Sequence, residues 1–212
     1  MQRNLVVITL NYLLSIALLT LFSNNICLAF ERKLELVPLV GFRAGGSFED
    51  EVSESKLDID HGLCYGMALN YDFNPDSQLQ LLWTRQDTEV KTPSGPDPKL
   101  DFSIDYLHFG STYSGYYTET IRVYVIASLG ATFLKPDHSN YDDERHFSGG
   151  LGGGIKYYFT DHIGFVLEAR GFCTFMGGQT SVFCGSDQGC HIRTYQDFLI
   201  QFQGISGVVF RF

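Results

Sequence analysis

Alternation of apolar and polar residues is the feature that most constrains what this chain of 212 residues can fold into. It begins at residue 34 and recurs in eight runs, at 34–43, 63–73, 79–86, 102–113, 121–133, 147–159, 163–175 and 198–212. A period of two places successive side chains on opposite faces of a strand, whereas a helix requires apolar residues three or four apart. The alternation therefore predicts an all-β protein.

The apolar face of these strands has two possible directions. It points inward in a soluble sandwich or barrel, and outward to lipid in a membrane barrel. The connections at 74–77, 115–119 and 160–162 are short, and those at 47–61, 87–101, 135–145 and 177–195 are long. Short turns on one rim, long loops on the other and an even number of strands are typical of membrane barrels. We predict an eight-stranded antiparallel up-and-down transmembrane β-barrel with both chain ends in the periplasm.

The opposite faces of these strands carry charges that a narrow lumen can neutralise by pairing. We expect a polar cluster in the lumen, formed by Arg43, Arg122, Lys156, Glu168 and Arg170. Eight strands enclose a space only just wide enough for side chains, so we interpret this cluster as an internal salt-bridge plug. The alternative is a polar constriction in a narrow or gated channel. A wide general porin is excluded.

Two details concern the strand ends and the fourth run. The run at 102–113 places Asp105 and His108 among apolar neighbours on both parities, which we interpret as a bulge.

Aromatic residues gather beside the short turns, where a girdle at the membrane interface is expected. They are Tyr71, Phe73, Tyr116, Tyr117, Tyr157, Tyr158 and Phe159.

The first 29 residues differ in composition from the rest of the chain. Arg3 is their only charge, an apolar run extends from Leu5 to Phe22, and a small residue, Ala29, ends the segment. This pattern is typical of a secretory signal peptide, with an uncleaved membrane helix as the alternative because the run is long. We predict a signal peptide at 1–29 and a barrel domain at 30–212.

Four cysteines follow the leader, and an exported chain enters a compartment that permits disulfides. Cys184 and Cys190 enclose a short loop that contains two glycines and can bend tightly, so we predict a disulfide between them. The alternative is two free thiols in a flexible loop. Cys64 and Cys173 lie inside strand-like runs, where we expect them to be small buried hydrophobes.

The charge of the chain excludes some partners. Its formal net charge is -9 with an isoelectric point near 5.0, which argues against a nucleic-acid-binding surface. Most acidic residues fall in the long loops, but without the spacing of a calcium-binding loop, so we interpret these loops as solvated and predict no metal site. The glycines at 149–154 do not complete a dinucleotide fingerprint, because Ile155 occupies the position of its last glycine, and we predict no cofactor.

Several segments resemble small eight-stranded bacterial outer-membrane β-barrel proteins of the OmpA/OmpW-like kind. They are 35–50, 102–113, 167–171, 183–190 and 201–212, so the resemblance extends over the whole chain after the leader. It implies location in the cell outer membrane of a Gram-negative bacterium, contact with outer-membrane lipids and lipopolysaccharide, and a monomeric state. Phe210 and Phe212 are similar to the C-terminal signal that the outer-membrane assembly machinery reads. The resemblance is specific for fold and location, and it carries no shared catalytic motif.

One pair of residues suggests an enzyme. Some eight-stranded barrels are lipid A deacylases with a His-x-Ser pair, and His146 and Ser148 share a strand face within reach of each other. However, Ser148 falls on the lumen parity, and Gly149 stands where that motif continues with Asn. We therefore predict a non-enzymatic protein that serves membrane structure and surface interaction. The alternatives are a narrow or gated channel for small solutes and a lipid A-modifying hydrolase centred on His146 and Ser148.

Overall fold

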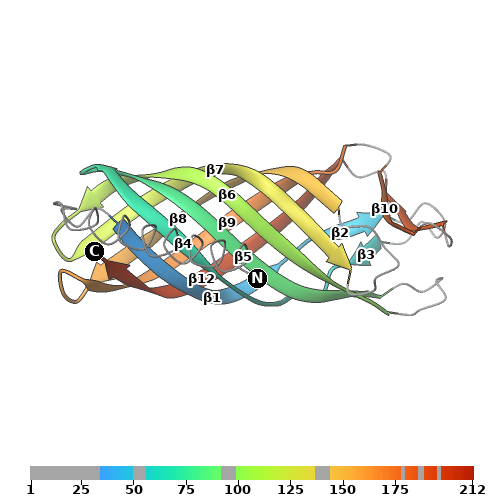
Figure 1. Cartoon of the computed structure of the whole chain (residues 1–212), viewed down its shortest axis with the longest axis horizontal. Helices are drawn as coiled ribbons and strands as arrows, with labels where there is room; N and C mark the ends of the chain where they lie inside the picture. The colour runs from blue at the N-terminus through green and yellow to red at the C-terminus, as the bar shows by residue number, and fades with distance from the viewer. Residues whose placement is uncertain are drawn as a thin grey trace, which may run out of the picture. The chain divides into compact units, whose positions relative to one another are not determined.

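Eight long antiparallel strands close into one barrel (Figure 1). The computed structural model describes residues 34–49, 56–91, 99–136, 144–177, 180–185, 189–194 and 197–212. Around the barrel the strands follow one another in chain order, and the last strand pairs with the first. They are β1 (Leu34–Ala44), β4 (Gly62–Asn74), β5 (Ser77–Lys91), β6 (Lys99–Tyr117), β7 (Ile121–Pro136), β8 (Glu144–Tyr158), β9 (Ile163–Phe175) and β12 (Phe198–Arg211).

The side chains follow the alternation, with the apolar face outward. Leu63 is 73% exposed and Leu151 is 70% exposed, whereas Arg43 and Lys156 on the opposite parity are 0% and 1% exposed. A soluble barrel would show the reverse, because apolar burial drives its folding. The fold is therefore an all-β, eight-stranded transmembrane barrel, as the alternation and the connections predicted.

The two ends of the barrel differ. Tight turns join β4 to β5, β6 to β7 and β8 to β9, and they lie at the end where β1 begins and β12 finishes. At the other end the chain forms two small two-stranded sheets, which lie beyond the barrel in Figure 1. They are β2 (Ser47–Glu49) with β3 (Lys56–Asp58), and β10 (Thr180–Gly185) with β11 (Gly189–Thr194). We call these the turn end and the loop end.

The strands extend further toward the loop end than the sequence pattern indicated. We expected a loop at 87–101, but the pairing of β5 with β6 continues from Ser77 to Lys91, opposite Tyr113 to Lys99. The loop prediction at 135–145 was likewise too long, since β7 ends at Pro136 and β8 begins at Glu144. A backbone ladder requires no apolar side chains, so it extends past the alternating segment.

Two further expectations were wrong in detail. β6 pairs with β5 without interruption over 102–113, and its register shift against β7 lies between Ser114 and Tyr116. The mixed polarity of the run has a different cause: His108 faces the lumen, while Asp105 faces outward and is covered by Lys135. Tyr158 is not part of the outer aromatic girdle, because it is 6% exposed and points into the lumen.

The predicted leader at 1–29 lies outside the residues that the structure describes. Within the described residues, no helix is long and apolar enough to cross a membrane. The backbone register of β10 and β11 places Cys184 opposite Cys190, but their side chains are also outside the described part, so the disulfide stays a prediction. Cys64 is free and buried as expected, whereas Cys173 is free and only partly buried.

Gly66 tests how closely the barrel strands approach one another. A Cβ atom at this position would lie 2.0 Å from the carbonyl oxygen of Trp83 and 2.8 Å from the Cα of Thr84, so the backbone would have to move. We expect Gly66→Val to cost at least about 1–3 kcal/mol and to lower the fraction of protein that migrates as a folded barrel in unheated gel samples. Gly204→Val is the matched control, because nothing lies within 4 Å of its Cβ position. Equal folding of the two variants would contradict this packing.

Candidate functional site in the barrel lumen

The lumen is filled by polar and charged side chains that come from all eight barrel strands. Each strand directs alternate residues inward, so the narrow interior gathers side chains far apart in sequence. The charged side chains among them are buried away from water. Each therefore needs an oppositely charged or hydrogen-bonding partner inside the lumen. From the turn end to the loop end, they form successive layers.

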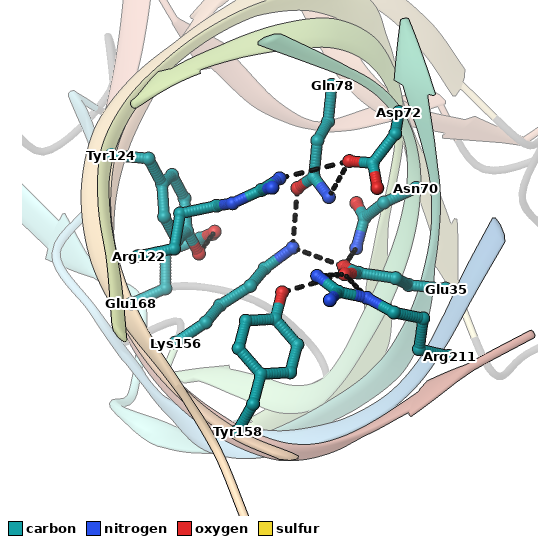
Figure 2. Close-up of polar contacts among 10 residues, drawn as sticks. All are labelled: Glu35, Asn70, Asp72, Gln78, Arg122, Tyr124, Lys156, Tyr158, Glu168 and Arg211. Atoms are coloured by element: carbon teal, nitrogen blue, oxygen red, sulfur yellow. Dashed lines mark hydrogen bonds and ion pairs between the residues drawn. The ribbon is translucent and has the colours of Figure 1, made fainter. Parts of the chain in front are cut away.

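Glu35 is the centre of the layer nearest the turn end (Figure 2). The ammonium of Lys156 donates to its Oε2 at 2.6 Å, and the hydroxyl of Tyr158 donates to its Oε1 at 2.7 Å. The guanidinium of Arg211 donates to the same Oε1 at 2.8 Å and lies 3.9 Å from the centre of the Tyr158 ring. Glu35 is 0% exposed, so one carboxylate joins β1 to β8 and β12 across the lumen.

A chain of hydrogen bonds extends this layer to the opposite wall. Lys156 also donates to Oε1 of Gln78 at 2.6 Å, and the amide of Gln78 donates to Asp72 at 2.7 Å. Asp72 in turn accepts from Arg122 at 3.0 Å. Two carboxylates and three cations thus form one network that crosses the barrel, as the dashed lines in Figure 2 show.

The next layer is built on Glu168. Arg170, two residues along the same strand, donates to its Oε1 at 2.6 Å, and Tyr124 donates to its Oε2 at 2.7 Å. Arg170 also donates to Gln80 on β5 at 2.7 Å, across the lumen. Both oxygens of the carboxylate are therefore satisfied, and the ion pair is excluded from solvent.

Arg43 occupies the layer nearer the loop end. Its guanidinium donates to Oε1 of Gln203 at 2.7 Å, to Thr84 at 2.7 Å and to the carbonyl of Ile104 at 3.2 Å. It lies 4.6 Å from the centre of the Tyr106 ring, and that ring stacks on Phe172 with centres 4.2 Å apart. No carboxylate among the described residues pairs with Arg43, so neutral oxygens and the aromatic faces carry its charge.

His108 lies between these layers and holds two serines. Its Nδ1 is 3.1 Å from the hydroxyl of Ser128, and its Nε2 is 2.9 Å from the hydroxyl of Ser148. His146 instead pairs with Glu144 at 3.0 Å. His146 and Ser148 therefore do not form the His-x-Ser pair suggested by the sequence, because Ser148 hydrogen-bonds to His108 on β6. Within the described residues, no group of His, Cys, Asp and Glu is arranged to hold a metal ion.

Some polar atoms in the lumen lack a protein partner in the described part of the chain. Near the turn end they include the hydroxyls of Thr112 and Ser114, and further along they include Nη1 of Arg170 and the amide nitrogen of Gln203. Buried polar groups without protein partners are sites where ordered water binds. The lumen is packed by side chains but retains polar positions that water can use.

All five residues of the expected polar cluster face the lumen, in three layers. Arg122 and Lys156 join the Glu35 network, Glu168 pairs with Arg170, and Arg43 lies apart from both. The alternation missed the central acid, since Glu35 stands at the very start of the first run. Its signal was its parity: it alternates with Leu34 and Leu36, which face outward.

The fold and this lumen define a small outer-membrane-type barrel with a filled interior. The model of one family, the outer membrane protein beta-barrel domain, matches residues 17–187, and the chain belongs to that family. No curated protein sequence matches the chain. Among solved structures it is similar to Neisserial surface protein A, with 14% identity and a TM-score of 0.57 over 86% of this chain and 98% of that one. It is also similar to OprG from Pseudomonas aeruginosa, with 14% identity and a TM-score of 0.50 over 84% and 95%. At these identities the two structures support the fold alone.

Glu35→Gln tests the central layer. The substitution leaves Lys156 and Arg211 buried without their carboxylate, which we expect to cost about 3–5 kcal/mol. Trp83, the only tryptophan, allows urea unfolding from lipid vesicles to be followed by fluorescence. Asp87→Asn is the control, because its side chain is 65% exposed and its pair with Arg85 is worth less than about 1 kcal/mol. Similar losses in the two variants would contradict a central role for Glu35.

Proposed function

We propose that the protein is a non-enzymatic barrel with a closed lumen, which serves outer-membrane structure and presents its loop end for surface interaction. The observation that carries the proposal is the pair of side-chain layers across the lumen. The Glu35 network spans the barrel near the turn end, and Arg43 with Tyr106 and Phe172 spans it toward the loop end. A hydrated solute would have to break buried ion pairs in one layer and displace stacked rings in the other.

The loop end supports a role at the cell surface. Asp60, Asp87, Glu89 and Asp101 line a groove of about 390 Å³ there. The acidic side chains of this groove favour the approach of positively charged surfaces over negatively charged ones. Outer-membrane barrels turn their longer connections to the outside, so this groove faces the surroundings of the cell.

A second candidate function is a narrow channel. The polar lumen atoms without protein partners favour it, because bound water at these positions would leave a partly hydrated path. Closed barrel and channel differ in one measurable property, the conductance of the purified protein.

Planar bilayer recordings test the closed lumen. We expect no steady conductance from the wild-type barrel, and openings when Arg43→Ala, Tyr106→Ala and Phe172→Ala, which remove the layer toward the loop end, are combined with Glu35→Gln, which breaks the ion pairs of the layer near the turn end. Leu81→Ala is the control, since its side chain faces outward and is 46% exposed. Steady conductance by the wild-type protein would overturn the closed lumen and favour the channel.

The hydrolase alternative has its own test. Ser148 is 0% exposed and faces the lumen, so a lipid in the membrane does not reach it. We expect overexpression of the wild type and of Ser148→Ala to give the same lipid A profile in mass spectra of membrane extracts. Deacylated lipid A that appears with the wild type and disappears with the variant would show catalysis.

A further inference from the structure

The outer wall of the barrel carries an apolar groove that the lumen site does not use. It has a volume of about 920 Å³ and is lined by residues of β5, β6, β7, β8, β9 and β12. Small residues form its floor and large apolar residues form its sides. The floor includes Ala127, Gly149 and Gly171, and the sides include Phe109, Phe147 and Phe175.

The groove is open beside Gly149. A Cβ atom there would have only one neighbour within 4 Å, the Cδ2 of Leu129 at 3.8 Å, so a side chain at this position would occupy open space. Phe147 and Leu151 stand on either side of Gly149 along β8 and are 56% and 70% exposed. The space beside Gly149 is therefore bounded by projecting apolar side chains and can take up a hydrocarbon chain.

Cations follow the groove toward the loop end on two adjacent strands. Arg145 precedes Phe147 on the same face of β8, roughly 7 Å away at the usual strand rise. Its guanidinium lies 5.7 Å from the centre of the Phe133 ring on β7, and Lys135 lies 5.9 Å from the same ring. The ring thus separates and orients two positive groups at the end of the groove.

The two cations differ in how much charge they offer. Lys135 is 3.1 Å from the carboxylate of Asp105, which neutralises part of its charge. Arg145 is exposed, and no carboxylate among the residues that the structure describes pairs with it. An exposed guanidinium fixed over an aromatic face presents two donors that match the oxygens of a phosphate.

The height of Arg145 places it at a membrane surface. Tyr157, in the aromatic girdle of the turn end, stands twelve residues away on the same face of β8. At about 3.3 Å per residue and a strand tilt of about 40°, this separation corresponds to roughly 30 Å along the membrane normal. Because the hydrocarbon layer has about that thickness, Arg145 lies at the headgroups of the leaflet on the loop side.

We propose that this groove and the cations Arg145 and Lys135 form a binding site for one phosphorylated, acylated lipid of the outer leaflet. Arg145 and Lys135 hold the phosphate, and one acyl chain lies along Gly149 between Phe147 and Leu151. The inference rests on the membrane role proposed above and names its partner. A soluble ligand is disfavoured because the whole groove faces hydrocarbon.

A second groove on the barrel provides the comparison. It has a volume of about 530 Å³ and is lined by Phe42, Ala169, Phe202 and Gly204 on β1, β9 and β12. Among the described residues, no outward lysine or arginine follows it toward the loop end on these strands. It therefore offers a surface for a hydrocarbon chain but no partner for a phosphate.

The test uses the full chain, folded in detergent and checked by heat-modifiable migration. Native mass spectrometry measures how much bisphosphorylated lipid A, or its dephosphorylated form, each barrel retains. At about fivefold per basic residue at a membrane surface, we expect Arg145→Gln to lower retention of the phosphorylated form about fivefold and the double variant with Lys135→Gln to lower it further. Retention of the dephosphorylated form, which offers the two cations no phosphate, should stay unchanged in both variants.

The apolar half is tested separately. Gly149→Leu fills the groove and should lower retention of both lipid forms, whereas Gly204→Leu fills the second groove and should not. Equal retention of the two lipid forms by the wild type, or unchanged retention of the phosphorylated form in the double variant, would overturn the site. A folded, non-conducting barrel without this selectivity would refute the lipid site alone, and a conducting barrel that retains the phosphorylated lipid would refute only the closed lumen.

Discussion

The structure depends on the requirement that every backbone N–H and C=O inside a bilayer be bonded within the protein. A sheet meets it only by closing, and here closure is the pairing of β1 with β12, which joins the start of the described chain to its end. That seam is interrupted at Val37 and Pro38, since proline has no N–H to donate. Pro38 still pairs in register with Met67 on β4. β1 is therefore paired without a gap on its β4 side and with a gap on its β12 side.

Closure in lipid reverses the usual arrangement of a protein, and the polar residues become the interior that must be packed. Side chains of this interior are satisfied by two devices. Glu35 and Glu168 each collect several donors, so that buried cations lie beside buried acids. Arg43 has neutral acceptors and stacked rings instead, which lets a charge remain where no carboxylate of the described residues pairs with it. Both devices fill the lumen, and the filled lumen holds opposite walls together.

The sequence was sufficient for the number of barrel strands and for the residues that share a face, because these follow from a local period of two. The alternation of short and long connections then indicated that the apolar face is the one that meets lipid. The sequence was insufficient for the partners inside the lumen. Glu35 meets Lys156 and Arg211 across sequence separations of 121 and 176 residues, and only the tilt and stagger of the closed barrel fix such meetings. The loop bounds were misplaced because backbone pairing continues where side-chain alternation has already ended. The bulge was misplaced because the outward Asp105, which pairs with Lys135, disturbs the alternation without disturbing the register. Tyr158 belongs to an aromatic segment, but its position in the alternation turns its side chain into the lumen, where its hydroxyl donates to Glu35.

The lumen and the outer groove are two consequences of one thin wall. A barrel wall is a single layer of backbone, so a run of glycines on β8 removes side chains from both of its faces. On the inner face, a Cβ at Gly150 would lie 2.7 Å from the hydroxyl of Ser128 and 3.2 Å from the Phe172 ring, so the lumen packing occupies the space that this glycine leaves. On the outer face, none of the residues that the structure describes fills the space beside Gly149, which is open to the lipid around the barrel. One run of glycines therefore lets side chains pack against Gly150 in the lumen and leaves the outer wall beside Gly149 to the membrane.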